Sequence, residues 1–387
     1  MNRTPLAWLN LTHDPRRLAL AVAGIGFAVL LMCMELSIRK ALVDNSIAVI
    51  EHMNGQLFIV SKAEYTIAVR EGFSHQRLAQ ALGCPAVVGA YPLYIESHRS
   101  SFKNLALDGE APPIRVLAFK PDDPVFDFPQ VAAHHRDLRL PNRALYDEKS
   151  KDEYGAVTVG QRVELADHAL EIIGLFSLGT DFANDGNLIV SDLTFRDVFP
   201  VGPGRDPLEI VDVGIIRLNV NKKRDVFEAQ RDLRERLPPD VDVLTKDEFV
   251  GRERLFWNKS TPIGFIFWLG TWMGFIVGSV ICYQILSTDV TEHLPQFATL
   301  KAMGYANRYF VWVILQEAVL LSLMGFVPGV LLSVLFCWAA SHLTHLQIDV
   351  PLLTAVEVLL ISMAMCAVSA RLAVQRVMRV DPAELFA

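Results

Sequence analysis

Four long apolar blocks constrain this 387-residue chain more than any other feature of its sequence. They cover residues 18–38, 262–286, 310–341 and 352–370, and none contains more than one acidic or basic side chain. A helix needs about 20 apolar residues to cross the hydrocarbon core of a bilayer, so each block predicts one transmembrane helix. Gly325, Pro328 and Gly329 lie in the middle of the third block, where they predict a kink or a break.

Basic residues beside the blocks predict their orientation, because cytoplasmic segments carry an excess of Lys and Arg. They precede the first block, separate the second from the third and follow the fourth: Arg3, Arg16, Arg17, Lys301, Arg308, Arg371, Arg376 and Arg379. Segment 342–351 contains neither Lys nor Arg. We therefore expect segments 1–17, 287–309 and 371–387 inside the cell, and segments 39–261 and 342–351 outside it.

The N-terminal segment 1–17 carries Leu6, Trp8 and Leu11 among polar residues. It predicts an amphipathic stretch on the inner membrane surface, or alternatively a short disordered tail. Charged residues, among them Glu35 and Arg39, stand where a signal peptide would carry small cleavage-site residues, so we expect the first block to be an uncleaved anchor.

Segment 39–261 predicts a large mixed α+β domain inserted between the first and second transmembrane helices. Residues 57–61, 114–119, 170–176 and 211–218 are short β-branched or aromatic runs typical of strands, and residues 222–237 form a charged amphipathic pattern typical of a helix. Ser74 is a candidate cap for a helix with Leu78 and Leu82 on one face. Residues 37–53 and 246–259 are helical in pattern and continue into the apolar blocks. They predict rigid stalks, or alternatively two independent helices with flexible joints.

Motifs for chemistry are missing from the sequence. It contains no G-x-x-x-x-G-K-[ST] phosphate loop, no H-E-x-x-H and no G-x-S-x-G, so we expect no ATP hydrolysis by this chain, no enzyme activity and no cofactor on it. Three polar groups have metal-like composition: His342, His345 and Asp349; His134 and His135; Asp181, Asn184, Asp185 and Asn187. Solvated loops and turns explain each better than a metal site. No polybasic run is present, which argues against nucleic acid as a partner.

Glycines and carboxylates inside the blocks are candidates for helix packing and for function. Gly270, Gly274 and Gly278 recur every four residues and predict a close helix–helix contact, within the bundle or between subunits, unless they are incidental. The blocks also hold three carboxylates: Glu35, Glu317 and Glu357. Glu35 and Glu317 are expected near the ends of their helices, and Glu357 deeper in the membrane.

The inner segment 287–309, STDVTEHLPQFATLKAMGYANRY, places apolar residues at helical spacing, with Phe297, Leu300 and Met303 on one face. Gly304 suits a helix end. The segment predicts a short helix that docks another protein, or alternatively a connector lying on the membrane surface.

At this segment the sequence resembles the DevC-type permeases of the MacB/FtsX-like superfamily of ABC transporters. Similar stretches include TPIGFIFWLGTWMGFIVGSVICYQILSTDVTEHLPQFATLKAMGY, QEAVLLSLMGFVPG, the outer-domain runs AFKPDDPVF and GLFSLGTDFANDGNLIVSD, and the ending VDPAELF. The resemblance implies an ATPase-coupling segment formed by Val290, His293, Gln296, Phe297, Leu300, Lys301, Met303, Gly304 and Tyr305.

The resemblance further implies a homodimer in the bacterial inner (cytoplasmic) membrane, with both termini cytoplasmic. A separate ABC ATPase subunit binds ATP and Mg. The outer domain is then periplasmic and meets a membrane-fusion protein and a TolC-like outer-membrane channel. ATP-driven motion reaches this domain through the stalks and exports a lipid-like or hydrophobic substrate. The alternatives are a non-transporting FtsX-like mechanical regulator of periplasmic cell-wall hydrolases, and a membrane receptor, which would need a cytoplasmic signalling domain.

Overall fold

The computed structural model describes residues 13–63, 66–68, 71–107, 111–202, 204–219, 223–293, 306–344 and 348–378, together with Trp8, Leu11, Gln296, Thr299 and Met303. The chain divides into two compact units. One unit contains the apolar helices, and the other contains residues 41–261. His345 and five residues of the expected coupling segment lie outside the described residues.

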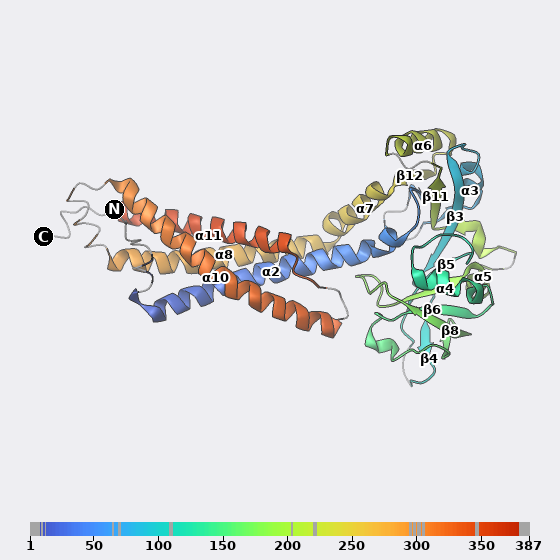
Figure 1. Cartoon of the computed structure of the whole chain (residues 1–387), viewed down its shortest axis with the longest axis horizontal. Helices are drawn as coiled ribbons and strands as arrows, with labels where there is room; N and C mark the ends of the chain where they lie inside the picture. The colour runs from blue at the N-terminus through green and yellow to red at the C-terminus, as the bar shows by residue number, and fades with distance from the viewer. Residues whose placement is uncertain are drawn as a thin grey trace. The chain divides into compact units, whose positions relative to one another are not determined.

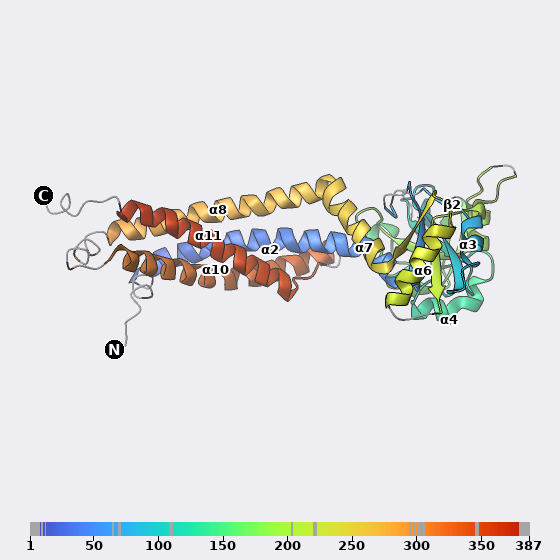
Figure 2. The same ribbon diagram turned by 90° about the horizontal axis from the view of Figure 1, so that it is seen from above.

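The helical unit consists of four long helices that run side by side in both views (Figures 1 and 2). They are α2 (Pro15–His52), whose part after Lys40 belongs to the other unit, α8 (Pro262–Glu292), α10 (Asn307–Thr344) and α11 (Leu352–Met378). Each is long and apolar enough to cross a membrane, which confirms four candidate apolar helices.

Small residues let α2 and α10 approach each other closely. The backbone of Gly26 on α2 faces Gly325 and Gly329 on α10, where a Cβ added to Gly329 would lie 2.7 Å from the Gly26 carbonyl oxygen. The buried core around this crossing includes Ile25 and Val29. Lipid chains are as apolar as the helix side chains, so the hydrophobic effect does not drive helices together in a bilayer. Dispersion contacts at such a close backbone approach supply the packing energy instead.

Pro328 lies inside α10, and the helix continues through it from Asn307 to Thr344. Of the two predicted outcomes, a kink or a break, the break does not occur. A proline removes one helical hydrogen bond, but transmembrane helices tolerate it where neighbouring helices pack against the site. Here α2 provides that support, because the Pro328 ring lies beside Gly26.

The other unit is built on a ten-stranded mixed sheet with strand order β12-β1-β11-β3-β5-β9-β6-β8-β7-β4. Most neighbours are antiparallel, whereas β5 pairs with β9 and β6 with β8 in parallel. The strands are β1 (Leu57–Ser61), β3 (Val87–Glu96), β4 (Phe102–Asn104), β5 (Arg115–Phe119), β6 (Arg143–Asp147), β7 (Arg162–Leu165), β8 (His168–Phe176), β9 (Asn187–Ser191), β11 (Val213–Leu218) and β12 (Val241–Thr245). A small second sheet pairs β2 (Phe73–Ser74) with β10 (Ile210–Val211).

Both faces of the sheet are covered, so its central strands are apolar throughout rather than alternating. In β1, Leu57 and Ile59 enter one core while Phe58 and Val60 enter the other. The covering helices are α3 (Gln76–Ala81), α4 (Pro129–Leu138), α5 (Asp192–Val198), α6 (Lys223–Arg236) and α7 (Lys246–Leu255), with short turns η1 (Asp152–Tyr154) and η2 (Pro207–Glu209). The last turns of α2 and Phe249 of α7 lie in the second core.

The predicted strand runs fall on β1, β5, β8 and β11, and the charged amphipathic pattern falls on α6. His75 stands at the N-cap position of α3, and the Ser74 hydroxyl accepts a 3.4 Å hydrogen bond from the Gln76 amide at the start of that helix. Of the two leucines predicted on one face, Leu78 is buried, whereas Leu82 is 51% exposed. His134 and His135 belong to α4 rather than to a loop. Each histidine Nδ1 contacts a carbonyl of its own helix.

Candidate functional site

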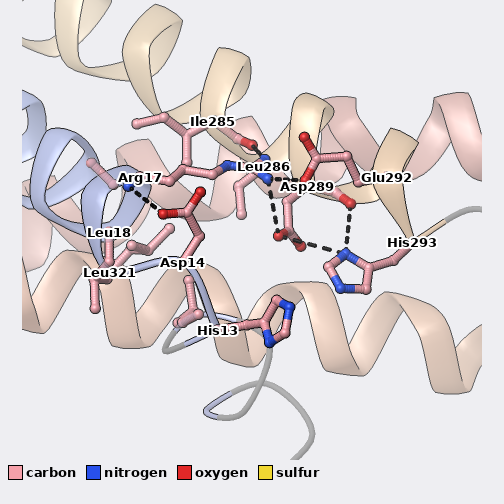
Figure 3. A pocket seen from close by; sticks show the side chains of 12 residues that line it. His13, Asp14, Arg17, Leu18, Ile285, Leu286, Asp289, Glu292, His293 and Leu321 are labelled. Carbon is pink, nitrogen blue, oxygen red and sulfur yellow. Dashed lines mark hydrogen bonds and ion pairs between the residues drawn. The ribbon is translucent and has the colours of Figure 1, made fainter.

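An ion-pair cluster joins the start of α2 to the end of α8 (Figure 3). The Arg17 guanidinium contacts Glu292 at 2.5 Å and Asp289 at 3.8 Å, and it donates a 3.0 Å hydrogen bond to the Ile285 carbonyl. We call Arg17, Asp289 and Glu292 the α2–α8 clamp. Asp289 and Glu292 lie at the start of the segment 287–309, which is expected to couple to an ATPase.

The clamp corrects an unfavourable charge pattern at each helix end. The last turn of α8 contains no basic residue although a helix C-terminus favours cations, and Asp289 and Glu292 add negative charge there. The first turn of α2 has the opposite mismatch, because it carries Arg16 and Arg17 and no acidic residue. Bringing Arg17 to the end of α8 offsets both. Asp14 completes the arrangement, since its carboxylate accepts from the Arg16 amide at 3.0 Å and caps α2.

Partial burial strengthens the interactions within the clamp. The side chains of Arg17 and Asp289 are 22% and 10% exposed, whereas Glu292 is 61% exposed. Leu18 and Leu321 line a cavity of about 40 Å³ together with Arg17, Asp289 and Glu292. His293 lies against Asp289, with its Nδ1 at 3.0 Å from the Asp289 carbonyl and 3.7 Å from the Asp289 carboxylate.

The structure separates the expected coupling residues into an inward and an outward set. Val290 is 1% exposed and lies in the core of the helical unit, and His293 is half-buried against Asp289. Gln296 is exposed and Met303 is 63% exposed. Val290 can therefore contribute to coupling by helix packing but not by direct contact with a partner. The remaining members are outside the described residues: Phe297, Leu300, Lys301, Gly304 and Tyr305.

The glycine stripe of α8 faces α2. A Cβ added to Gly270 would lie 2.6 Å from the Glu35 carboxyl carbon, and one added to Gly274 would lie 2.8 Å from Met32 Cγ. Gly278 faces Ala28 and, from α11, Met365. These glycines thus lie at a contact within one chain, beyond the clamp on the same pair of helices.

Two of the carboxylates in the apolar helices, Glu317 and Glu357, differ in their burial. Glu317 is fully buried, about 15 Å along α10 from Asn307 at 1.5 Å per residue, whereas Glu357 is exposed. Glu317 lies ten residues after the start of a helix of 38 residues, and its position relative to the membrane interface stays a prediction. A buried carboxylate within an apolar helix is costly, so Glu317 joins Glu357 as a candidate site residue.

The stalk segments of the α/β unit are fastened to each other. The Lys246 ammonium at the start of α7 donates to the carbonyls of Glu51 and Met53, at 2.6 and 3.0 Å, and Arg254 at its end pairs with Asp44 at 3.2 Å. The two attachment points are about 12 Å apart along α7 and about 10 Å apart along α2, which fits two antiparallel helices in register. The end of α2 and α7 therefore form one element.

A buried carboxylate lies where this element ends. Glu253 on α7 is 1% exposed, and it accepts hydrogen bonds from the Thr66 hydroxyl, the Ile67 amide at 3.3 Å and Trp257 Nε1 at 2.9 Å. Burial nevertheless raises the pKa of Glu253 above its ordinary value, because desolvation outweighs these three donors. Trp257 belongs to a π-helical turn, η3 (Phe256–Ser260), which follows α7 directly.

The sequence did not identify Arg17 or Arg115 as a partner in an ion pair. The predictions treated Arg17 only as an orientation signal, and Arg115 received no role. Arg115 is 3% exposed and pairs with Asp181, while its Nε donates to Asn187 at 2.7 Å. Asp181 and Asn187, two residues of the third group with metal-like composition, therefore have a structural role. Among the described residues, no cluster of three metal-ligating side chains occurs.

Known proteins resemble parts of this chain. Residues 268–382 match the family model for the FtsX-like permease C-terminal domain, which covers most of α8 together with α10 and α11. An uncharacterized ABC transporter permease protein of Mycobacterium tuberculosis is 25% identical over 208 residues, which is 51% of this chain and 22% of that relative. The chain thus spans about a fifth of the length of that curated relative.

Two solved structures are similar at low identity. The periplasmic region of MacB from Actinobacillus actinomycetemcomitans aligns with 51% of this chain and 91% of that chain, at 10% identity and a TM-score of 0.33. The extracellular domain of the noncanonic ABC-type transporter YknZ from Gram-positive bacteria aligns with 49% of this chain and 99% of that chain, at 13% identity and a TM-score of 0.33.

Proposed function

Because residues 268–382 form an FtsX-like permease domain, we propose that this chain is the permease subunit of an ABC exporter. In this proposal a separate subunit binds and hydrolyses ATP with Mg. The permease transmits the resulting motion to its outer domain, which drives a lipid-like or hydrophobic substrate outward. The homology to an ABC transporter permease over half of the chain supports this assignment.

The observation that carries the proposal is the position of the α2–α8 clamp. It ties α2 to α8 immediately before the segment that leads to α10, and that segment lies within the FtsX-like region. A force applied to this segment would move α8 and α2 together, because a partly buried ion pair resists separation better than an exposed one. Met303 offers an exposed apolar side chain for a partner in the same segment.

The stalk supports the second half of the proposal. Helix α2 runs as one rod without interruption from Pro15 to His52. Lys246 and Arg254 fasten α7 to the last turns of that rod. In this proposal, a displacement or rotation of α2 reaches the sheet through the two attached helices.

The finer parts of the proposal come from the resemblance to DevC-type permeases. They are a homodimer in the bacterial inner membrane with cytoplasmic termini, a membrane-fusion protein and a TolC-like channel as further partners, and the lipid-like class of cargo. The exposed aromatic side chains of α8, among them Phe265, Trp268 and Trp272, suit contact with lipid or with a second copy.

Co-purification tests the proposal. We would express the chain with the products of its neighbouring genes, extract the membranes in mild detergent and identify what remains bound after size-exclusion chromatography. An ABC ATPase in stoichiometric amount is the expected result. If a cell-wall hydrolase is activated by the complex and no substrate moves, the chain is a mechanical regulator. If no ATPase is retained in detergent or in nanodiscs, the permease assignment fails.

A further inference from the structure

A groove between the first turns of α10 and the last turns of α11 is separate from the clamp and from the stalk. These helix ends lie at the same end of the helical unit (Figures 1 and 2). The groove has a volume of about 350 Å³. Its lining residues are Val311, Leu315, Ala367, Ala370, Arg371, Val374 and Gln375.

The groove has an apolar floor and a polar end. Ala370 and Val374 are 2% and 5% exposed and form part of the helix core, so the floor is fixed by packing. Arg371 and Gln375 are exposed and lie one helical turn apart on α11. Arg371 makes no ion pair or hydrogen bond with any residue that the structure describes, and the lining contains no carboxylate.

The position of Arg371 along α11 fits the level of the lipid headgroups in a bilayer that this helix spans. It lies 19 residues after Leu352, where α11 begins, which corresponds to about 28 Å at 1.5 Å per residue. The hydrocarbon core of a bilayer is about 30 Å thick, so a helix that spans it from Leu352 brings Arg371 to the opposite interface. Arg308 lies one turn before Val311 on α10 and adds a second exposed cation at that end.

We propose that this groove binds an anionic phospholipid of the inner leaflet. The phosphate pairs with the Arg371 guanidinium, Gln375 donates to a headgroup or ester oxygen, and the upper acyl chain lies over Val311, Leu315 and Val374. A guanidinium binds phosphate through two parallel donors, and basic pockets between helices on the cytoplasmic side favour anionic lipid. The proposal needs α10 and α11 in a bilayer, as the proposed function does, but it needs no ATPase.

Lipid retention by the full-length protein tests the site. We would purify the chain in mild detergent, titrate it with phosphatidylglycerol or phosphatidylcholine, and count bound lipid by native mass spectrometry. We expect one phosphatidylglycerol per chain to bind in preference to phosphatidylcholine. Arg371→Gln should weaken phosphatidylglycerol binding about fivefold to tenfold, as expected for one lost interfacial charge contact. Arg371→Lys should retain most of the affinity.

Two controls separate this site from general charge effects and from other occupants. Arg231→Gln removes the same charge from an exposed position of α6 and should leave lipid binding unchanged. Inorganic phosphate at millimolar concentration should neither compete with the lipid nor raise the melting temperature. Equal binding of phosphatidylglycerol by wild type and Arg371→Gln would overturn the proposal. So would a groove that a second chain fills, seen as cysteine cross-linking between chains at position 311 without lipid loss in Arg371→Gln.

Discussion

Arg17 at the start of α2 and Glu292 at the end of α8 contact each other at 2.5 Å across 275 positions of sequence. The pair joins the two helices that precede and follow the α/β domain. The same α2 helix is held a second time by α7, through Arg254 and Asp44. The helices that enter and leave the domain are thus linked in each of the two units.

We predict that Arg17→Gln lowers the free energy of unfolding by about 1–2 kcal/mol. This loss lies between the contributions of an exposed ion pair and of a buried one. Glu292 is solvated, whereas the substitution leaves Asp289 partly buried without its cation. Arg16→Gln is the matched control, since Arg16 is exposed and adjacent. Thermal unfolding in detergent should separate the two variants, and equal melting temperatures would show that the clamp contributes nothing to stability.

Gly329→Ala should destabilise the helical unit by about 1–3 kcal/mol. The added Cβ would lie 2.7 Å from the Gly26 carbonyl oxygen, and backbone atoms of a packed helix cannot move aside as a flexible side chain can. Gly251→Ala on α7 is the control, because no atom lies within 4 Å of its added Cβ, and it should stabilise through helix propensity. Similar melting temperatures for the two variants would mean that α2 and α10 are not in backbone contact.

Glu253 should make stability fall as the pH rises. Its folded pKa is raised, so the folded protein holds the proton more tightly than the unfolded chain does. Its contribution is therefore complete below the unfolded pKa near 4.5 and is lost as the pH rises through the folded pKa. Glu253→Gln should flatten the dependence of melting temperature on pH above 4.5, whereas Glu148→Gln, at an exposed site, should not. An unchanged pH profile in Glu253→Gln would contradict this.

Arg115→Met should cost about 3–5 kcal/mol in the α/β unit, because it leaves the Asp181 carboxylate buried without a cation. Arg139 and Asp122 form a comparable pair on the surface, with side chains 55% and 39% exposed. Arg139→Met should therefore cost less than about 1 kcal/mol. Denaturant unfolding followed by circular dichroism measures both, and equal losses would show that burial of the pair is energetically unimportant.

Local patterns in the sequence were sufficient to predict much of the fold. An apolar block reports burial in lipid whatever its neighbours are, so the four helices were predictable. The strand β1 was predictable for a related reason, since its five residues are apolar or small and are buried on both faces. The helical ends of the α/β unit were also visible as patterns, although their attachment to each other through Lys246 was not.

Contacts between distant segments were not predictable from one sequence. Arg17 and Arg115 resemble ordinary basic residues until the fold brings carboxylates beside them. The acidic last turn of α8, which lacks any basic residue, was a usable signal for a cation supplied by another helix. The burial of Glu317 was not predictable for the same reason, because it depends on how the other helices pack against α10.

The central claim is that a separate ATPase drives this chain through the segment between α8 and α10. The most direct test is the rate of ATP hydrolysis by the co-purified ATPase in nanodiscs, alone and with wild-type, Met303→Glu or Met303→Leu permease. Met303 is exposed, so neither change should disturb folding. We predict that wild type and Met303→Leu change the rate severalfold and that Met303→Glu does not. A rate that is the same with and without the permease would contradict the account.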